Sequence, residues 1–280
     1  MIPQRNLSLL ANRTFQSQGG RRIPEAIYER DYCLAWFLIG LASNRLRDLL
    51  AFKGGTALKR MYFPDYRFSE DLDFTLTEPA SFDDILEHLA TLHRDVAERS
   101  GVKFAVVPES HTEHERGHTL FLSYIGPWPT VSQVKRVKVD VTKSERIVFD
   151  LEERSVDTSC AEYDLPDHGT LRVYALEEIA TEKIVALLDR ARNEPRDLYD
   201  MWHLIDSCGL NLNDVQAAVH QKLAFRGRNL DQVRGEFVAK ERRLAQLWDS
   251  RLAAQMSRLP PLDEVYRVVQ RGLRRSGFVS

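Results

Sequence analysis

The sequence has few cysteines and no long apolar run. Its three cysteines, Cys33, Cys160 and Cys208, have no CxxC spacing and form neither a zinc motif nor a disulfide framework. No segment approaches the roughly 18 consecutive apolar residues of a membrane-spanning helix, and residues 1–20 are polar where a signal peptide would be apolar. These absences argue against secreted disulfide scaffolds and membrane proteins, and they predict a cytoplasmic location.

Charge is distributed unevenly along the 280 residues. The net charge is only -2, yet residues 221–280 hold 13 Lys and Arg against 6 Asp and Glu, so the rest of the chain is acidic. A basic block of this kind is typical of a nucleic-acid surface and equally of solvated helix faces. By itself it decides nothing, and it becomes informative only beside a catalytic site.

Apolar spacing predicts an α+β protein with a small mixed sheet and a helical C-terminal part. We place a boundary between Cys160 and Thr170, which gives a core with N-terminal helices at 1–165 and a helical domain at 166–280. Period-two alternation or β-forming composition marks strands at 72–76, 103–107, 118–124 and 134–141. Helical spacing marks 24–50, as one long or two short helices, and also 56–61, 82–100, 176–190, 197–207, 213–223, 239–256 and 261–273.

Two aspartates lie on one face of the strand predicted at 72–76. Asp71 and Asp73 are two residues apart, so their carboxylates face the same side while Leu72 and Phe74 point into the core. Neighbouring carboxylates repel each other, and a divalent cation relieves that repulsion. The pair therefore predicts a metal site, with Mg²⁺ as the natural ion, although most isolated DxD pairs are solvated edges or turns.

A glycine turn precedes these acids. In Lys53-Gly54-Gly55-Thr56 the two glycines open a predicted helix, where free backbone N–H groups can hold phosphate. An ordinary tight connection between elements would have the same composition. Ser69 shares the strand parity of Asp71 and can reach the same pocket, or it can serve only as a turn or capping residue.

A third acid, Asp140, sits on the polar side of an alternating strand whose valines face the other way. A solvent-facing sheet surface explains it without any chemistry. Alternatively, three acids on neighbouring strands could hold two metal ions, and Asp140 would then suit the general base that deprotonates an attacking hydroxyl.

A lysine and an aspartate in the helical part could complete the site. Lys183 points out of the helix predicted at 176–190, and phosphoryl transfer needs such a cation on the nucleotide phosphates. Asp197 begins the next helix and can either cap it or hold Lys183 in place. For Arg196 and Asp200, capping and ordinary ion pairing are the preferred interpretations.

Together these segments resemble the nucleotidyltransferase toxins of the AbiEii/AbiGii type, which include the MenT toxins of mycobacteria. The likeness spans most of the chain, and order, spacing and context agree. It rests on Lys53-Gly54-Gly55-Thr56-Ala57-Leu58, Arg67-Phe68-Ser69-Glu70-Asp71-Leu72-Asp73, Glu182-Lys183-Ile184 and Arg196-Asp197-Leu198-Tyr199-Asp200.

The resemblance implies a polymerase-β-like core, Mg²⁺ (two ions), a nucleoside triphosphate substrate and a cognate antitoxin. It also implies transfer of a nucleotide to the tRNA acceptor end, which blocks aminoacylation and so translation. By carry-over, Asp71 and Asp73 bind metal, Lys183 and Asp197 complete the active site, and Ser69 is a possible site of inactivating phosphorylation. Residues Gly55, Thr56 and Ser69 would line the phosphate pocket.

One departure from the wider superfamily concerns the glycine turn. The superfamily has Gly-Ser before its acid pair, whereas this chain has Gly55-Thr56, 15 residues before Asp71. The leading hypothesis is a monomeric, Mg²⁺-dependent transferase acting on an RNA 3′ hydroxyl. A metal-dependent nuclease and a nucleotide-sensing or partner-binding protein without turnover are the alternatives.

Overall fold

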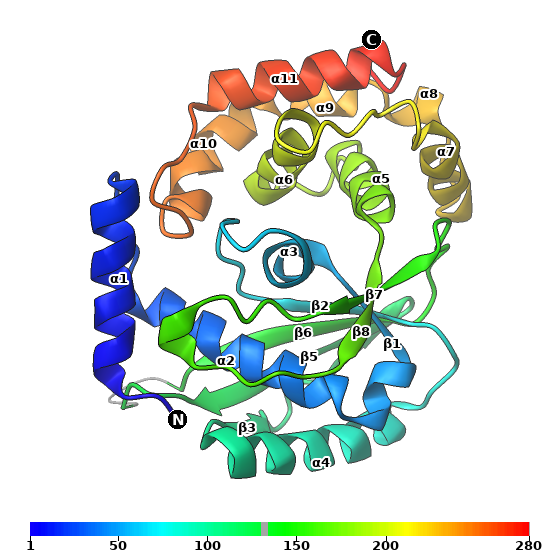
Figure 1. The fold of residues 1–280 in the computed structure, drawn as a ribbon. Coiled ribbons are helices and arrows are strands. Elements are labelled where there is room, and N and C mark those ends of the chain that lie inside the picture. The colour runs from blue at the N-terminus through cyan, green and yellow to red at the C-terminus, as the bar shows by residue number, and fades with distance from the viewer. Residues whose placement is uncertain (130–133, 280) are drawn as a thin grey trace. The chain divides into compact units, whose positions relative to one another are not determined.

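A computed structural model describes residues 1–129 and 134–279, which form two compact units (Figure 1). The first unit contains Met1–Glu145, Leu151–Val173 and Gln255–Ser257. The second contains Arg146–Asp150, Tyr174–Ala254 and the residues from Arg258 onward. Each unit therefore includes a short segment taken from the middle of the other unit's sequence.

The first unit is built on one mixed sheet. In the described residues it has eight strands in the order β3-β5-β6-β2-β1-β8-β7, with β4 paired to β5. Strand β2 is parallel to β6 and antiparallel to β1, which confirms the predicted mixed sheet. The strands are β1 (Leu50–Lys53), β2 (Leu72–Leu76), β3 (Lys103–Val106), β4 (Thr112–His114), β5 (Gly117–Ile125), β6 (Arg136–Thr142), β7 (Leu151–Ser155) and β8 (Thr170–Tyr174).

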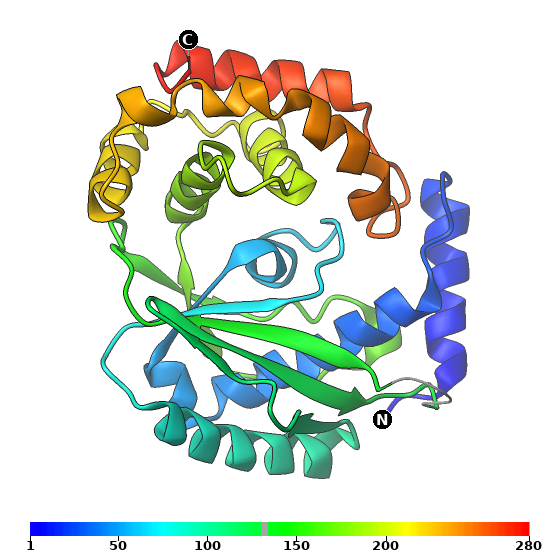
Figure 2. The same cartoon turned by 180° about the vertical axis from the view of Figure 1, so that it is seen from behind.

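Helices of the first unit flank this sheet, with α4 below it and α3 above it in both ribbon views (Figures 1 and 2). Helix α4 begins at a capping box between Ser81 and Asp84 and ends at Gly101, whose φ of 76° favours glycine. The helices are α1 (Gln4–Gln18), α2 (Glu25–Ala42), η1 (Arg45–Asp48), α3 (Gly54–Ala57), the π-helical turn η2 (Leu58–Tyr62), α4 (Phe82–Ser100) and η3 (Ala161–Tyr163).

The two faces of the sheet differ in polarity. Along β6, Val137, Val139 and Val141 are buried, whereas Lys138 and Asp140 between them are only half-buried. The buried valines join the core formed with the apolar side chains of α2 and α4. The polar face is therefore the side of the sheet on which charged side chains can meet a ligand.

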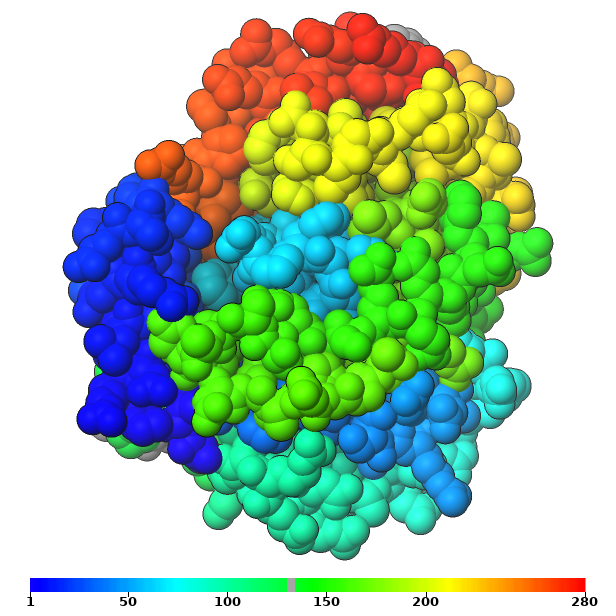
Figure 3. Space-filling view, viewed as in Figure 1, coloured from blue at the N-terminus to red at the C-terminus, as the bar shows by residue number. Residues whose placement is uncertain are grey.

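Helix α1 is attached to the first unit by polar contacts with the segment that leads from β7 to β8. Asn6 Nδ2 donates to the backbone oxygen of Glu162 over 3.2 Å, and Arg13 pairs with the Glu162 carboxylate at 2.6 Å. In the space-filling view, α1 lies beside this green segment, which is at the surface (Figure 3).

The second unit is helical, as the sequence pattern predicts for the part after Val173. Glu178, which is fully buried, accepts the backbone N–H groups of Val148 and Phe149 at 2.9 Å each and pairs with buried Lys222 at 2.6 Å. These contacts fix Arg146–Asp150 within this unit. Its helices are α5 (Leu176–Leu187), α6 (Pro195–Asp206), α7 (Gln216–Phe225), α8 (Leu230–Val233), α9 (Glu236–Ala239), α10 (Glu241–Leu252) and α11 (Leu262–Arg275).

Most predicted helices and strands are confirmed, although several of their boundaries differ from the structure. The predicted strand 72–76 and helix 82–100 agree with β2 and α4. For 24–50 the structure has two helices, since α2 ends at Ala42 and η1 follows, and the predicted helical stretch runs too far only at Leu50, which begins strand β1. Strand β1 has all four residues buried and therefore lacks the alternation that reveals a strand. The sequence pattern also missed β4, β7 and β8.

In the described part of the chain, no helix has the length and apolar character required to cross a membrane.

Gly40 lets α2 approach α4 closely. A Cβ at this position would overlap Val96 Cγ2 of α4. We predict that Gly40→Ala lowers the free energy of unfolding by about 1–3 kcal/mol, because overpacking a core outweighs the gain in helix propensity. Urea denaturation measures the change. The control is Gly235→Ala, since a Cβ at Gly235 meets nothing within 4 Å. Equal stability of the two variants would contradict the prediction.

Candidate active site

Three of the predicted acids occupy the polar face of the sheet. Strand register places Asp73 of β2 beside Asp140 of β6 and opposite Lys53 of β1. Asp71 precedes β2 by one residue and has the same parity as Asp73. All three aspartates are half-buried, so they face a space that is shielded but open to solvent. The sheet thus brings together side chains that are up to 87 residues apart in the sequence.

Asp140 and Lys53 already have protein partners on this face. Thr119 Oγ1 donates to Asp140 Oδ1 at 2.5 Å, and Lys138 Nζ pairs with Asp140 Oδ2 at 2.6 Å. Lys53 Nζ donates to Thr142 Oγ1 at 3.2 Å. These donors fix the orientation of the Asp140 carboxylate and offset part of the negative charge of the three acids.

The glycine turn packs directly against the acids. Gly54 has a φ of +79°, and a Cβ there would overlap the carboxylate of Asp73. A Cβ at Gly55 would lie 2.8 Å from Arg67 Nη2 and 3.0 Å from Ser69 Oγ. A larger residue at Gly54 would therefore displace the Asp73 carboxylate, and one at Gly55 would displace the ends of the Arg67 and Ser69 side chains.

Thr56 links the glycine turn to Asp71 through a hydrogen bond. Its hydroxyl donates to the backbone oxygen of Asp71 at 2.5 Å, and the side chain is buried. The predicted residues Lys53, Gly54, Gly55 and Thr56 thus adjoin the acid pair. Ser69, the proposed regulatory residue, is 8% exposed.

Arg67 lies beside the site, although the sequence pattern predicted no role for it. It is buried, and its Nη1 donates to Gln255 Oε1 at 2.9 Å and to the backbone oxygen of Phe68 at 3.2 Å. Its proximity to Gly55 places a guanidinium next to the glycine turn. The sequence feature that could have indicated a role for Arg67 is its position two residues before Ser69, in the motif that ends at Asp73.

The residues of this face fit a magnesium ion that completes its coordination with substrate. Their donors are carboxylate oxygens, and the Asp73 carboxylate packs against Gly54, where any larger residue would displace it. Among residues 1–129 and 134–279, no three His, Cys, Asp or Glu side chains gather closely enough to hold a metal alone. Mg²⁺ is commonly bound by one or two carboxylates together with phosphates and water, which matches the Asp71–Asp73 pair.

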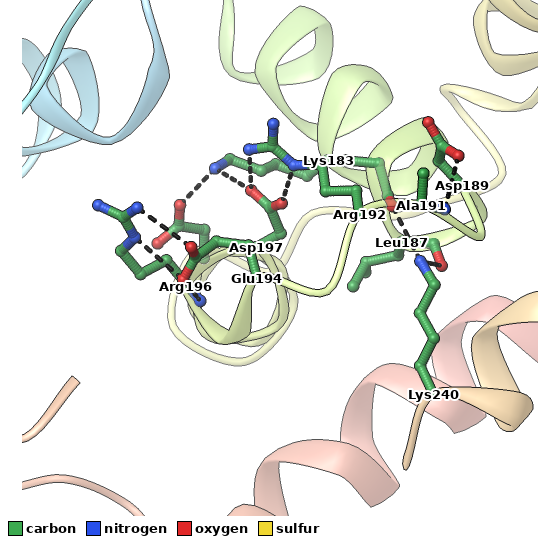
Figure 4. Close-up of polar contacts among 11 residues, drawn as sticks. Lys183, Leu187, Asp189, Ala191, Arg192, Glu194, Arg196, Asp197 and Lys240 are labelled. Carbon is green, nitrogen blue, oxygen red and sulfur yellow. Dashed lines mark hydrogen bonds and ion pairs between the residues drawn. The ribbon is translucent and has the colours of Figure 1, made fainter. Parts of the chain in front are cut away.

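The second unit places Lys183 in a buried ionic cluster (Figure 4). Lys183 Nζ lies 2.7 Å from Asp197 Oδ1 and 2.7 Å from Asp200 Oδ2. The side chains of Asp197 and Asp200 are 2% and 0% exposed, so α6 supplies two buried carboxylates to one lysine of α5. Asp200 thus pairs with the same lysine as Asp197, which ordinary capping would not require.

Arg192 also binds Asp197, a contact that the sequence gave no reason to expect. Arg192 Nε lies 2.5 Å from Asp197 Oδ2, and Nη2 donates to Oδ1 at 3.2 Å. Burial disfavours the charged carboxylate, but Lys183 and Arg192 outweigh burial and lower the pKa of Asp197 to about 2. Asp197 therefore stays ionised at neutral pH. Arg196 pairs instead with Glu194 at 3.1 Å, as an ordinary ion pair.

Solved structures resemble this arrangement of elements. MenT4, a nucleotidyltransferase toxin from Mycobacterium tuberculosis H37Rv, has a TM-score of 0.60 and 20% identity, covering 97% of this chain and 88% of that one. JHP933 from Helicobacter pylori has a TM-score of 0.55 and 15% identity, covering 91% and 94%. These similarities show the fold, which is the fold of a nucleotidyltransferase toxin.

Sequence comparison gives the family. The family model described as nucleotidyl transferase AbiEii toxin, type IV toxin–antitoxin system, matches residues 36–268. The chain belongs to this AbiEii family of nucleotidyltransferase toxins, as its motifs suggested. No curated protein is detectably similar to it in sequence.

Gly54→Ala should damage the site without unfolding the protein. The added Cβ would displace the Asp73 carboxylate, so we predict a loss of nucleotidyl transfer of about 100-fold or more, of the order seen when a catalytic group is misplaced. Gly209→Ala is the control, since Gly209 also has a positive φ of +69° but no neighbour within 4 Å. Both variants carry similar backbone strain, so equal activity would contradict a role for the close approach.

The ionic cluster makes stability depend on pH. Because Asp197 titrates at about 2 in the folded protein and at 3.8 ordinarily, it stabilises the fold above about pH 4, and this contribution disappears as pH falls toward 2. We expect Asp197→Asn to cost about 2 kcal/mol near neutral pH, since one pKa unit is about 1.4 kcal/mol, and progressively less in acid. Urea unfolding between pH 3 and 7 measures this, with the exposed residue Asp206→Asn as control. A pH-independent difference would refute the assignment.

Proposed function

We propose that this toxin transfers a nucleoside monophosphate from a nucleoside triphosphate to the 3′ hydroxyl of an RNA, with tRNA as the acceptor. Such a modification would block aminoacylation and hence translation. The observation that carries the proposal is the approach of Gly54 to the carboxylate of Asp73, beside a second and a third acid on the polar face of the sheet. Membership of the AbiEii family supports the transferase activity, and a glycine turn that opens a helix can offer backbone N–H groups to substrate phosphates.

Asp71 and Asp73 are proposed to hold Mg²⁺, which when bound neutralises phosphate charge and favours deprotonation of the attacking hydroxyl. In the reaction the RNA 3′ oxygen forms a bond to the α-phosphorus, and the bond to pyrophosphate breaks. Asp140 is proposed to accept the hydroxyl proton, because its carboxylate is fixed by Thr119 and Lys138. Lys53, in register with Asp73, limits repulsion among the acids.

Lys183 is proposed to steady the triphosphate, and Asp197 to orient Lys183. A lysine held by two buried carboxylates has a fixed position, which supports a phosphate-binding role. The glycine turn, with Thr56 and Ser69, is proposed to line the phosphate pocket.

The basic helices from α7 to α11 are proposed to bind the RNA backbone. Residues 221–280 carry 13 Lys and Arg against 6 Asp and Glu. Phosphate contacts release counterions, so RNA affinity should fall steeply with salt. An antitoxin partner follows from the type IV toxin–antitoxin family, and phosphorylation of Ser69 is proposed as one way to inactivate the toxin.

The test of the reaction is incubation of the protein with labelled nucleoside triphosphates, Mg²⁺ and total tRNA. We expect label to join full-length RNA, pyrophosphate to be released, and a chelator to stop both. Asp73→Asn should reduce transfer about 1000-fold or more, because it removes a negative charge that is proposed to bind the metal. Asp95→Asn, an exposed acid on α4, is the control and should retain full activity.

Three outcomes would contradict the proposal. Shortened RNA would indicate a metal-dependent nuclease, and tight nucleotide binding without pyrophosphate, with every RNA supplied, would indicate a sensor. Transfer that survives in Asp73→Asn would separate the activity from the polar face of the sheet.

A further inference from the structure

The cluster around Asp197 contains two cations with very different exposure. The side chain of Lys183 is 11% exposed and lies between two buried carboxylates. The side chain of Arg192 is 54% exposed, although it is bound to the same Asp197. The more accessible positive charge of this cluster therefore belongs to Arg192.

Asp197 holds the Arg192 guanidinium side-on. Nε contacts Oδ2 at 2.5 Å and Nη2 contacts Oδ1 at 3.2 Å, so two donors on one edge of the planar group engage both carboxylate oxygens (Figure 4). This bidentate contact fixes the plane of the guanidinium. A long side chain that is already ordered loses less conformational entropy when it binds a ligand.

The loop that carries Arg192 is itself anchored. Lys240, which is buried, donates to the backbone oxygens of Ala186 and Leu187 at 3.2 Å and 2.8 Å, at the end of α5. Asp189 accepts the backbone N–H of Ala191 at 3.1 Å (Figure 4). Asp189 also pairs with Arg228 at 3.3 Å. Arg192 therefore extends from a loop that is held by hydrogen bonds and an ion pair, and its partner Asp197 lies at the start of α6.

Charge balance explains why Arg192 can serve a ligand without disturbing the cluster. Lys183 and Arg192 offset Asp197 and Asp200, so the buried carboxylates are compensated before any ligand arrives. Lys183 can steady a phosphate only from its place between Asp197 and Asp200, because separating it from buried Asp200 would be costly. An anion that meets the exposed part of Arg192 requires no such separation.

We propose that Arg192 is a phosphate-binding residue, oriented by Asp197. A guanidinium is weakly hydrated and matches the spacing of two phosphate oxygens, whereas an ammonium acts as a point charge. The phosphate belongs either to the triphosphate of the nucleotide or to the backbone of the RNA. The inference rests on the proposed function only for the choice of these two ligands.

Arg190 provides a matched control. It has the same charge, lies two residues earlier in the same loop and is also exposed. Within the described residues it makes no ion pair with a carboxylate, so its guanidinium is not oriented as that of Arg192 is.

The experiment measures binding by wild type, Arg192→Ala, Arg192→Lys and Arg190→Ala to two probes separately. One probe is a non-hydrolysable nucleoside triphosphate with Mg²⁺, and the other is a tRNA without nucleotide. We expect Arg192→Ala to weaken one probe about tenfold or more, Arg190→Ala to change both less than about threefold, and Arg192→Lys to restore only part of the affinity. Thermal unfolding of each variant reports on folding, and Arg192→Lys keeps the charge if Arg192→Ala unfolds.

The probe that loses affinity identifies the source of the phosphate. A weakened RNA complex should also show a slope of log affinity against log salt that is smaller by about one. Wild-type affinity of Arg192→Ala for both probes, or an equal loss in Arg190→Ala, would overturn the inference. If wild type binds RNA but no nucleotide, the proposed function fails, and the role of Arg192 is decided by the RNA affinity of its variants. If wild type binds neither probe, both proposals fail.

Discussion

The position of β2 between β1 and β6 is the constraint on which the first unit's site depends. Parallel pairing with β6 aligns Asp73 with Asp140, and antiparallel pairing with β1 aligns Asp73 with Lys53. A shift of one residue would turn these side chains into the apolar core and bring the buried neighbours out. The core on the opposite face, made by the valines of β6 and the helices α2 and α4, therefore fixes the register that gathers the acids.

In the second unit, the constraint is that buried carboxylates need cationic partners. Asp197 and Asp200 are almost fully buried, and such carboxylates persist only because Lys183 and Arg192 accompany them. The cluster joins α5, the following loop and α6, so it stabilises that part of the unit while it holds two cations in defined positions. In our proposal, the contacts that form this structural ion-pair network also orient a phosphate-binding residue.

Local sequence signals identified β2 and α4, but they missed β8 although its residues alternate in burial. Strand β2 alternates between the acids and the apolar residues, and α4 has both a capping box and a terminal glycine, so both agreed with the structure. The signal failed at β1, which is buried throughout, and at β4, which is exposed throughout. Neither strand shows alternation, and each exists because of its partner in the sheet.

For the site, the sequence by itself determined the chemistry: two acids of the same parity, a glycine turn, and a lysine and an aspartate at helical positions, in the order typical of the AbiEii family. Only tertiary structure decided which groups meet. In the first unit, Gly54 contacts Asp73, and Arg67 lies next to Gly55. Asp140 is bound by Thr119 and Lys138. In the second unit, Arg192 and Lys183 both bind Asp197. The reason is physical, because side-chain identity and parity are local properties, whereas contacts between distant segments follow from strand register and helix packing that no short pattern encodes.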